Sequence, residues 1–292
     1  MSSIRDTQKI TNAMYLIAST KMRKAKEELD KSRPYFEALK GEIKRIFRTS
    51  RQVTSKYFYP PDGSAPLNGT YGCLVITADK GLAGAYNQNV IREALRLMED
   101  HPDTKLFVVG EYGRQYFMRH RIPIEKSFLY TAQNPTMQRA REISSLLLER
   151  FNAGQLDKIF VVYTDLQSSL REETICTRLL PFHRAHFDSV EEEQAAVRFN
   201  FQPSIEEVLD AVMPSYISGF IYSALVDSFC SEQNARIEAM SAANSNAEGI
   251  LTELAVQYNR VRQANITREI TEVSSGAKAQ KRKKQIHEVT KG

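Results

Sequence analysis

The segment of this 292-residue chain with the clearest potential for chemistry is a glycine-containing loop, Asp79-Lys80-Gly81-Leu82-Ala83-Gly84-Ala85-Tyr86-Asn87. It follows an apolar run typical of a strand and precedes a helical pattern, and phosphate groups often bind at such a helix start. The loop matches neither G-x-x-x-x-G-K-[ST] nor G-x-G-x-x-G, the two patterns that cradle nucleotide phosphates. We therefore expect a tight turn that needs glycine, and keep a Rossmann-type nucleotide-binding enzyme as an alternative.

The histidines give little evidence of a metal site or of a catalytic set. His183 and His186 are three residues apart and could hold a metal ion from one helical face. No third ligand accompanies them, and Pro181 favours a loop, so surface histidines are the better interpretation. No Ser-His-Asp or Cys-His set can be assembled from the five histidines. The sequence predicts no catalytic residue, no metal site and no cofactor.

The three cysteines are odd in number and lack C-x-x-C spacing: Cys73, Cys176 and Cys230. Buried thiols in a reducing compartment fit this usage better than disulfides or a zinc site. No secretory signal opens the chain, and no stretch approaches the roughly 20 consecutive apolar residues that span a bilayer. We expect a soluble protein with no direct membrane span.

Charge is segregated along the chain. Residues 1–56 hold 14 Lys or Arg against 6 Asp or Glu, and residues 276–292 hold 6 against 1, although the whole chain carries only +5. Lys281-Arg282-Lys283-Lys284 could touch nucleic acid, but no aromatic residues are interleaved with it. A solvated, disordered tail is the expectation for this segment, and acidic neighbours are expected for the basic ends.

The middle of the chain alternates between two patterns. Short apolar runs rich in β-branched residues predict buried strands, and helical patterns separate them. This alternation predicts a small, mostly parallel α/β domain. The expected strands are 73–77, 106–109, 159–163 and 174–180, with Pro181 at the end of the last, and the expected helices are 90–98, 112–120 and 137–151.

Both ends of the chain predict long helices. From Ser3, a candidate N-cap, to about Tyr57, apolar residues recur every three or four positions, with Pro34 expected to kink the helix. From Ser204, another candidate cap, the pattern is helical again, and no proline occurs between Ser215 and Ser274. That stretch alone would be about 90 Å long. A helix of this length needs a packing partner, so the two end helices are expected to pair as a left-handed coiled coil, with membership of a helical bundle left open.

The residues expected to face the partner helix, here called the seam, recur mostly every three or four positions on both end helices. On the first helix the seam includes Ile4, Ile10, Ala13, Met14, Ile17, Ala18, Met22, Ala25 and Leu29. On the last it reads Ile217, Ile221, Ala224, Ala235, Ala239, Ala242, Asn246, Ile250, Leu254 and Val261. The expected domains are a coiled-coil helix at 1–57, a globular α/β domain at 70–203, a coiled-coil helix at 204–275 and a basic tail at 276–292.

Two ordered sets of motifs resemble a known family. Thr7-Gln8-Lys9-Ile10-Thr11-Asn12-Ala13-Met14 and the following Ala18-to-Ala25 segment resemble the N-terminal helix of the gamma subunit of F-type ATP synthases, bacterial type. Ser231-Glu232-Gln233-Asn234-Ala235-Arg236 and the Tyr258-to-Glu272 segment are similar to that family's C-terminal helix, and Thr77–Gly84 is similar to its first strand-loop. The resemblance covers nearly the whole chain.

The resemblance implies a rotor shaft without an active site of its own. Its antiparallel coiled coil, formed by the two end helices, would fill a ring of alternating alpha and beta subunits, and its Rossmann-like α/β domain would form a foot against the epsilon subunit and the membrane c ring. Proton flow would turn this shaft and drive the beta subunits through their nucleotide affinities. The implied location is the cytoplasmic side of the cell membrane, as a peripheral subunit.

The resemblance also implies which residues touch partners. Arg236, Arg262, Gln263, Thr267 and Glu269 match polar positions that contact the alpha–beta ring. Lys21, Met22 and Arg23 match a basic turn that faces acidic loops of beta. A solvated helix face, or for Met22 a seam position, is the alternative for each.

The chain departs from the family pattern at both ends. It starts shortly before the Thr7 motif, so the natural start is expected upstream, and its tail continues beyond Ser275-Gly276 with basic residues. Two hypotheses rival the shaft: a coiled-coil adaptor with an α/β head, and the nucleotide-binding enzyme. Nucleotide binding by the isolated chain would favour the enzyme, and the effect of removing residues from Gln257 onward would separate shaft from adaptor.

Overall fold

The computed structural model describes residues 1–49, 53, 55–59, 69–129, 132–168, 171–183, 187 and 201–289. The chain divides into two units, one of Met1–Met14 with Met240–Gly292 and one of Tyr15–Ala239. Two long helices, α1 (Ser2–Thr49) and α5 (Ile205–Val289), contribute to both units.

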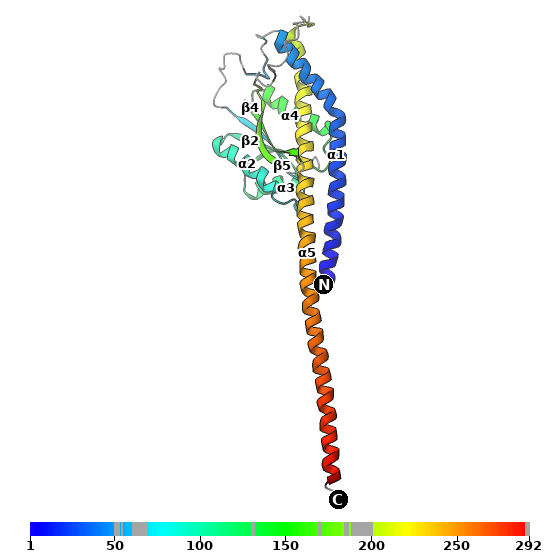
Figure 1. Ribbon diagram of the computed structural model, residues 1–292. Helices are drawn as coiled ribbons and strands as arrows, with labels where there is room; N and C mark the ends of the chain where they lie inside the picture. The colour runs from blue at the N-terminus through cyan, green and yellow to red at the C-terminus, as the bar shows by residue number, and fades with distance from the viewer. Residues whose placement is uncertain are drawn as a thin grey trace. The chain divides into compact units, whose positions relative to one another are not determined.

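The unit Tyr15–Ala239 contains a five-stranded sheet in the order β3-β2-β1-β4-β5. Figure 1 shows the sheet with β2, β4 and β5 labelled. The first four strands are parallel, and β5 is antiparallel to β4. The predicted α/β domain is therefore confirmed, with each expected strand and helix present. The elements are β1 (Tyr71–Ile76), α2 (Tyr86–Asp100), β2 (Thr104–Val109), α3 (Glu111–Arg119), β3 (Ile124–Phe128), α4 (Met137–Asn152), β4 (Lys158–Ser168) and β5 (Arg171–Leu180).

Alternate residues of the central strands enter two different cores. Leu74 and Ile76 of β1 belong to a cluster with α4 and the two long helices, whereas Cys73 and Val75 belong to a cluster with α2 and α3. All four side chains are fully or almost fully buried. Burial on both faces explains why β1, β2 and β4 read as unbroken apolar runs in the sequence.

Strand β3 escaped the sequence analysis. It reads Ile-Glu-Lys-Ser-Phe, lies at the edge of the sheet and exposes Glu125 and Lys126. A half-exposed edge strand of five residues carries no apolar run, so the pattern that identified the other strands could not find it.

Within the unit Tyr15–Ala239, α1 and α5 run antiparallel. The Cys230 Sγ atom lies 3.9 Å from the Met22 carbonyl oxygen, and Phe36 lies against Gly219, so positions rise along one helix as they fall along the other. A Cβ atom on Gly219 would come within 2.1 Å of the Phe36 ring. The glycine thus permits the close approach of the two helices.

The unit Met1–Met14 with Met240–Gly292 shows the same antiparallel pairing. Gln8 Nε2 donates to Glu248 Oε1 at 3.2 Å, and Thr11 Oγ1 donates to Asn244 Oδ1. These polar contacts replace apolar ones at the seam. The predicted coiled coil of the end helices is confirmed in each unit separately.

The seam itself differs from the predicted one at several positions. Ile217, Ile221 and Ala224 are buried as expected, but Ala242, Asn246, Ile250 and Val261 are exposed, and Ala247 is buried instead. On α1 the half-buried and buried positions include Ile4, Gln8, Thr11, Met14 and Ala18, whereas Ile10, Ala13 and Ile17 are exposed. Apolar residues lie on several sides of these helices, so hydrophobicity alone did not identify the contact stripe.

Helix ends account for the remaining differences. Ser3 lies inside α1 rather than capping it, and α1 ends at Thr49 instead of near Tyr57, with Pro34 inside the helix. Ser204 does cap α5, because its Oγ atom accepts from Glu207 N at 3.2 Å. Helix α5 continues to Val289, so residues 276–289 are helical and not the disordered tail expected from their charge. Lys, Arg, Gln and Ala are good helix formers, and no proline interrupts them.

Candidate functional site

The loop between β1 and α2 is a structural turn. Leu82 and Gly84 adopt positive φ values of 63° and 52°, which glycine tolerates at Gly84. Asn87 Oδ1 accepts from Ala78 N at 2.9 Å, and Asp79 Oδ1 accepts from Glu111 N at 2.9 Å, at the start of α3. The polar side chains that could have met a phosphate therefore hold the loop together.

Helix α5 closes the space above this loop. Arg236 forms an ion pair with Glu232 at 2.6 Å, and its Nη2 atom donates to Gly81 O at 3.1 Å. The two side chains are only 11% and 8% exposed. A carbonyl oxygen and a carboxylate already share this guanidinium, so Arg236 is not free to bind a phosphate group at the loop. The geometry disfavours the nucleotide-binding alternative.

Burial raises the pKa of Glu232, while Arg236 opposes that shift. Lys21 of α1 also attracts this carboxylate, so the structure brings two of the predicted contact residues, Lys21 and Arg236, to the same part of the helix pair. Sequence analysis did not single out Glu232 for this role, although its spacing of one helical turn from Arg236 was the available signal.

Further polar contacts attach α5 to the last two strands. Ser231 Oγ donates to the carbonyl oxygen of Thr164 at 3.4 Å, and Ser228 Oγ accepts from the amide of the same residue at 3.4 Å. Asn234 Nδ2 donates to Glu172 Oε1 at 2.9 Å. Together with the Arg236 contacts, these bonds join one face of α5 to both the β1–α2 loop and the sheet.

The predicted contact residues on α1 occupy different environments. Lys21 and Arg23 are exposed, whereas Met22 is half-buried and packs against the core shared with α5. Met22 therefore lies at the seam, the alternative that the sequence had left open for it. The exposed basic pair remains available to a partner.

The predicted contact residues near the C-terminus all lie exposed on α5. Arg262 and Glu269 are seven positions apart and share one face, while Gln263 and Thr267 are four apart on another. Thr267 Oγ1 donates to Gln263 O at 2.9 Å. Arg236, in contrast, is engaged by groups of its own chain, so its partner contact stays a prediction.

One half-buried carboxylate, that of Asp227, was not anticipated from the sequence. Burial, together with the neighbouring Asp165, raises the pKa of Asp227 to about 6. Ser223 Oγ donates to Asp227 Oδ2 at 3.3 Å, and Arg33 and Lys26 of α1 partly offset the shift.

The candidate metal and thiol chemistry finds no support in the described part of the chain. No group of three or more His, Cys, Asp and Glu side chains converges there, and His186 lies outside the described residues. The His183 ring stacks on Tyr59 with centroids 4.8 Å apart. The cysteines are free; burial raises the pKa of Cys176 to about 11 and that of Cys230 to about 12.

Helix α5 is the one helix among the described residues that is long and apolar enough to meet a composition criterion for crossing a membrane. Half of its most apolar 18-residue window is buried inside the structure. Core helices of soluble proteins meet the same criterion, so this finding is weak evidence for a span.

Comparison with known proteins decides the family. The family model described as ATP synthase matches residues 1–280. The ATP synthase gamma chain of Caldanaerobacter subterraneus subsp. tengcongensis is 41% identical over 286 residues, which cover 95% of this chain and 96% of the relative. The chain belongs to the ATP synthase gamma-chain family.

Other relatives agree with that assignment. The gamma chain of Acetivibrio thermocellus is 37% identical over 96% of this chain and 97% of its own length. The central stalk of the Tetrahymena thermophila mitochondrial ATP synthase has a similar fold, with a TM-score of 0.57, 22% identity, and coverage of 80% of this chain and 99% of that one. Gamma chains are non-catalytic central-stalk subunits of the F-type ATP synthase rotor, which is part of a membrane-associated complex.

Proposed function

We propose that this chain is the shaft that couples rotation of a membrane c ring to sequential conformational changes in catalytic beta subunits. The observation that carries the proposal is the exposure of α5 in the segment that follows its contacts with α1. Every residue from Val256 to Gln280 is exposed, and six of them are large and apolar. These are Val256, Tyr258, Val261, Ile266, Ile270 and Val273, with exposed fractions of 46–73%.

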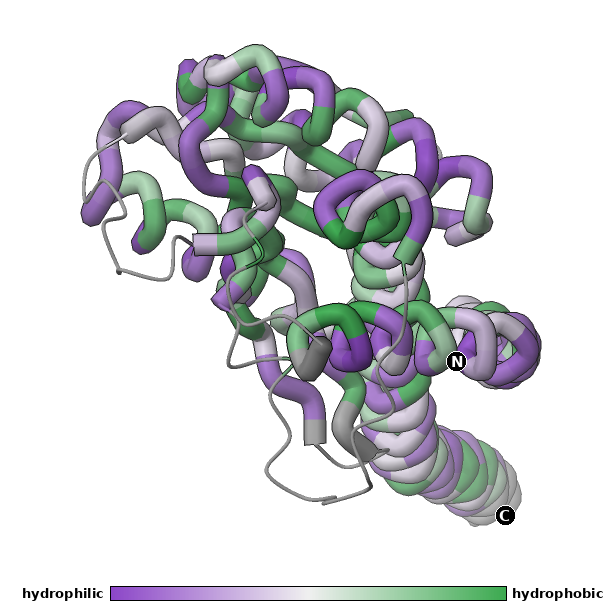
Figure 2. The backbone as a smooth tube through the Cα atoms, turned by 90° about the horizontal axis from the view of Figure 1, so that it is seen from above, coloured by the Kyte–Doolittle hydropathy of each residue, from purple (hydrophilic) through white to green (hydrophobic). Residues whose placement is uncertain are grey.

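The apolar residues of this segment are spread around the helix. At about 100° per residue, Val261 and Ile270 lie on opposite sides of the helix, and Tyr258 lies about 120° around the helix from Ile270. Figure 2 shows green and purple bands alternating along this part of α5. A helix that is apolar on several sides is stabilised by enclosure rather than by a single partner helix. A ring of alpha and beta subunits supplies such an enclosure.

Polar residues of the same segment would supply contacts to the ring, and the strength of each contact would depend on how far the helix has turned within the ring. Arg262 and Glu269 on one face, and Gln263 and Thr267 on another, would bond to the ring. A ring conformation is favoured only to the extent that it binds one face of the helix better than another. The shaft thus acts through differential contact and needs no active site.

The basic pair on α1 supports a second contact. Lys21 and Arg23 are exposed beside the seam residue Met22 and would face acidic loops of beta subunits. The α/β domain would form the foot, against the epsilon subunit and the c ring, on the cytoplasmic side of the cell membrane. The solved relatives include a central stalk with a c ring.

The coupling ion is proposed to be the proton. The gamma chain of Acetobacterium woodii, 33% identical, is named as sodium ion specific. No ion passes through a shaft, so ion choice belongs to the membrane ring.

The proposal is tested by mixing the full chain with the alpha and beta subunits of the same source. A stable complex whose ATPase activity depends on the chain is the expected result. Removing residues from Gln257 onward should impair coupled turnover, because the enclosed segment is lost. An adaptor would tolerate this truncation, and an activity indifferent to the chain would contradict the shaft.

A further inference from the structure

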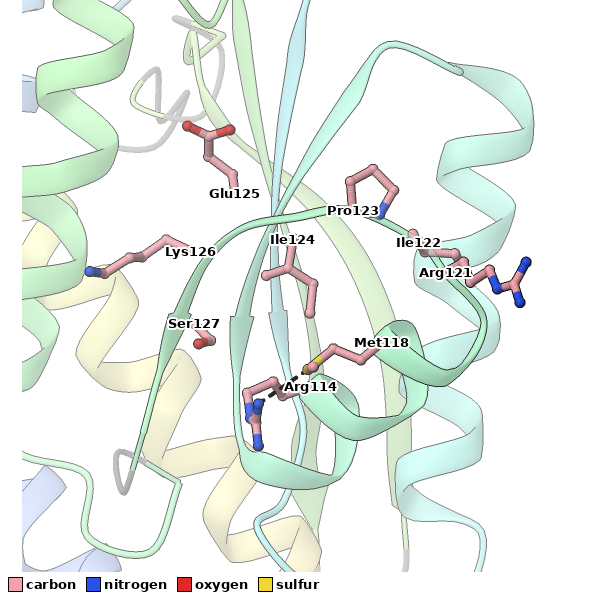
Figure 3. Close-up of a pocket in the computed structure, with 9 residues that line it drawn as sticks. All are labelled: Arg114, Met118, Arg121, Ile122, Pro123, Ile124, Glu125, Lys126 and Ser127. Carbon is pink, nitrogen blue, oxygen red and sulfur yellow. Dashed lines mark hydrogen bonds between the residues drawn. The ribbon is translucent and has the colours of Figure 1, made fainter.

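A methionine borders the groove of about 600 Å³ that lies between α3 and the face of the sheet (Figure 3). Met118, in the last turn of α3, lines this groove together with Arg114 and Ile124. In Figure 3 the Ile124 side chain points toward Met118, and a dashed line joins Met118 to Arg114. Arg121 and Lys126 point to opposite sides. The thioether of Met118 therefore lies next to open space.

Met118 is the most exposed of the eight methionines, all of which lie at described positions. Its side chain is 58% exposed, that of Met1 is 43% exposed, and Met213 and Met240 are buried. The half-buried ones are Met14, Met22, Met98 and Met137. Burial raises the pKa of all three thiols, so little thiolate competes for an oxidant. A dissolved oxidant should therefore reach Met118 first.

Arg114 is held in place beside the sulfur atom. Its Nε and Nη2 atoms donate to the Glu111 carboxylate at 2.7 and 2.6 Å. The same guanidinium directs Nη1 at Met118 Sδ, 3.1 Å away. A thioether sulfur is a weak acceptor, whereas an oxygen atom bonded to that sulfur would accept strongly from a charged donor. The ion pair with Glu111 thus fixes a donor where an oxidised side chain could use it.

We propose that Met118 is a site of reversible oxidation, at which hydrogen peroxide converts the thioether to a sulfoxide whose oxygen is bound by Arg114. The sulfur lone pair attacks one peroxide oxygen, and the S–O bond forms as the O–O bond breaks. The sulfur gives up two electrons, and the proton of the transferred oxygen passes to the departing hydroxide, which leaves as water. The sulfoxide is polar where the thioether was apolar, so the modification changes the wall of the groove.

The surroundings of Met118 permit this change without disturbing the core. The methionine side chain is unbranched and rotates about three bonds, so the sulfoxide can turn its oxygen toward Arg114 Nη1. The groove leaves room for one added oxygen atom. Oxidation of the buried Met213, in contrast, would place a polar group among packed side chains. The inference is independent of rotation.

The first test treats the full chain with dilute hydrogen peroxide and follows each methionine by peptide mass spectrometry. Met118 should gain one oxygen several-fold faster than the half-buried Met98 of the same domain, with Met1 second. The two methionine sulfoxide reductases, one for each epimer, should remove this oxygen again. Equal rates at Met118 and Met98, or a sulfoxide at Met118 that neither reductase removes, would overturn the proposal.

The second test asks whether Arg114 binds the sulfoxide oxygen. Nitrogen NMR on isotope-labelled arginine should show that exchange of the Arg114 guanidinium protons with water slows several-fold after oxidation. Arg121 lines the same groove but points away from Met118, and its exchange should not change. The matched variant Met118→Leu keeps an apolar side chain that peroxide does not oxidise, and it should show no slowing.

An unchanged Arg114 signal in a chain with fully oxidised Met118 would overturn the proposal, as would equal slowing in Met118→Leu. Neither result bears on ring binding, so the shaft proposal stands or fails separately.

Discussion

Arg236 and Glu232 form an ion pair of 2.6 Å one helical turn apart in α5, with almost no access to solvent. The pair is also bonded to the β1–α2 loop through Gly81. It therefore joins the long helix to the α/β domain at the place where related α/β folds hold a nucleotide.

Replacing Arg236 should destabilise the domain strongly. Arg236→Ala leaves the Glu232 carboxylate buried without its partner, and we expect a loss of about 3 kcal/mol in the free energy of unfolding. Urea unfolding followed by circular dichroism measures it. The double variant Arg236→Met/Glu232→Gln removes both charges and should recover most of the loss. If Arg236→Ala unfolds at the same urea concentration as the unmodified chain, the pair does not hold α5 to the domain.

The contact of Gly219 with Phe36 should not tolerate an added methyl group. Gly219→Ala would place its Cβ atom within 2.1 Å of the ring and cost about 1–3 kcal/mol in unfolding free energy. In a chain that also carries Phe36→Ala, Gly219→Ala should no longer meet the ring and should cost much less. A double-mutant cycle of the two substitutions measures this difference.

Gly249 provides the matched control for that substitution. It is also a helical glycine of α5, but a Cβ atom added there meets nothing within 4 Å. Gly249→Ala should raise stability by about 0.5–1 kcal/mol through helix propensity alone. Equal effects at the two glycines would contradict a close helix approach at Gly219.

Stability should depend on pH through Asp227. Its pKa is raised to about 6 in the folded chain from an ordinary value of 3.8, so the folded state binds the proton more tightly than the unfolded state. Stability from this group is present below about pH 4 and is lost as pH rises to about 6, by roughly 3 kcal/mol.

The variant Asp227→Asn removes this dependence. It should be more stable than the unmodified chain at pH 7 and should lose that advantage near pH 4, as thermal unfolding at a series of pH values would show. The charged groups around the site are Asp165, Arg33 and Lys26, and Asp165→Asn should reduce the effect without abolishing it. An Asp227→Asn advantage that is constant with pH would contradict the raised pKa.

The native thiols should react slowly. Burial raises the pKa of Cys73, Cys176 and Cys230 alike, so little thiolate is present at pH 8. Maleimide labelling followed by mass spectrometry should modify the half-buried Cys176 first and the other two only after denaturation. Rapid labelling of Cys73 in the folded chain would contradict its burial.

The sequence was most informative where one physical pattern dominated. Strands buried on both faces, such as β1, read as apolar runs, and the serine cap at Ser204 followed from simple hydrogen-bond logic. The seam between the long helices was only partly predictable, because Ile10 and Ile17 are apolar yet exposed, while Gln8 and Thr11 pair through polar bonds.

The candidate contact residues show the same limit. The exposure of Arg262 and Glu269 agreed with a solvated helix face. The bond from Arg236 to the Gly81 carbonyl oxygen joins segments 155 residues apart, and no local spacing predicts such a contact. Strand β3 was missed for a related reason, since an edge strand with charged residues lacks an apolar signature.

The central claim is tested most directly by watching the chain turn. A cysteine introduced at the exposed Arg92 position of α2 can carry a bead, because the three native thiols are poorly reactive. The chain is assembled with its alpha and beta subunits, the ring is fixed to a surface, and ATP is added. The account predicts rotation of the bead in one direction, driven by ATP and abolished when residues from Gln257 onward are removed. ATP hydrolysis by an assembled complex whose bead stays still would contradict it.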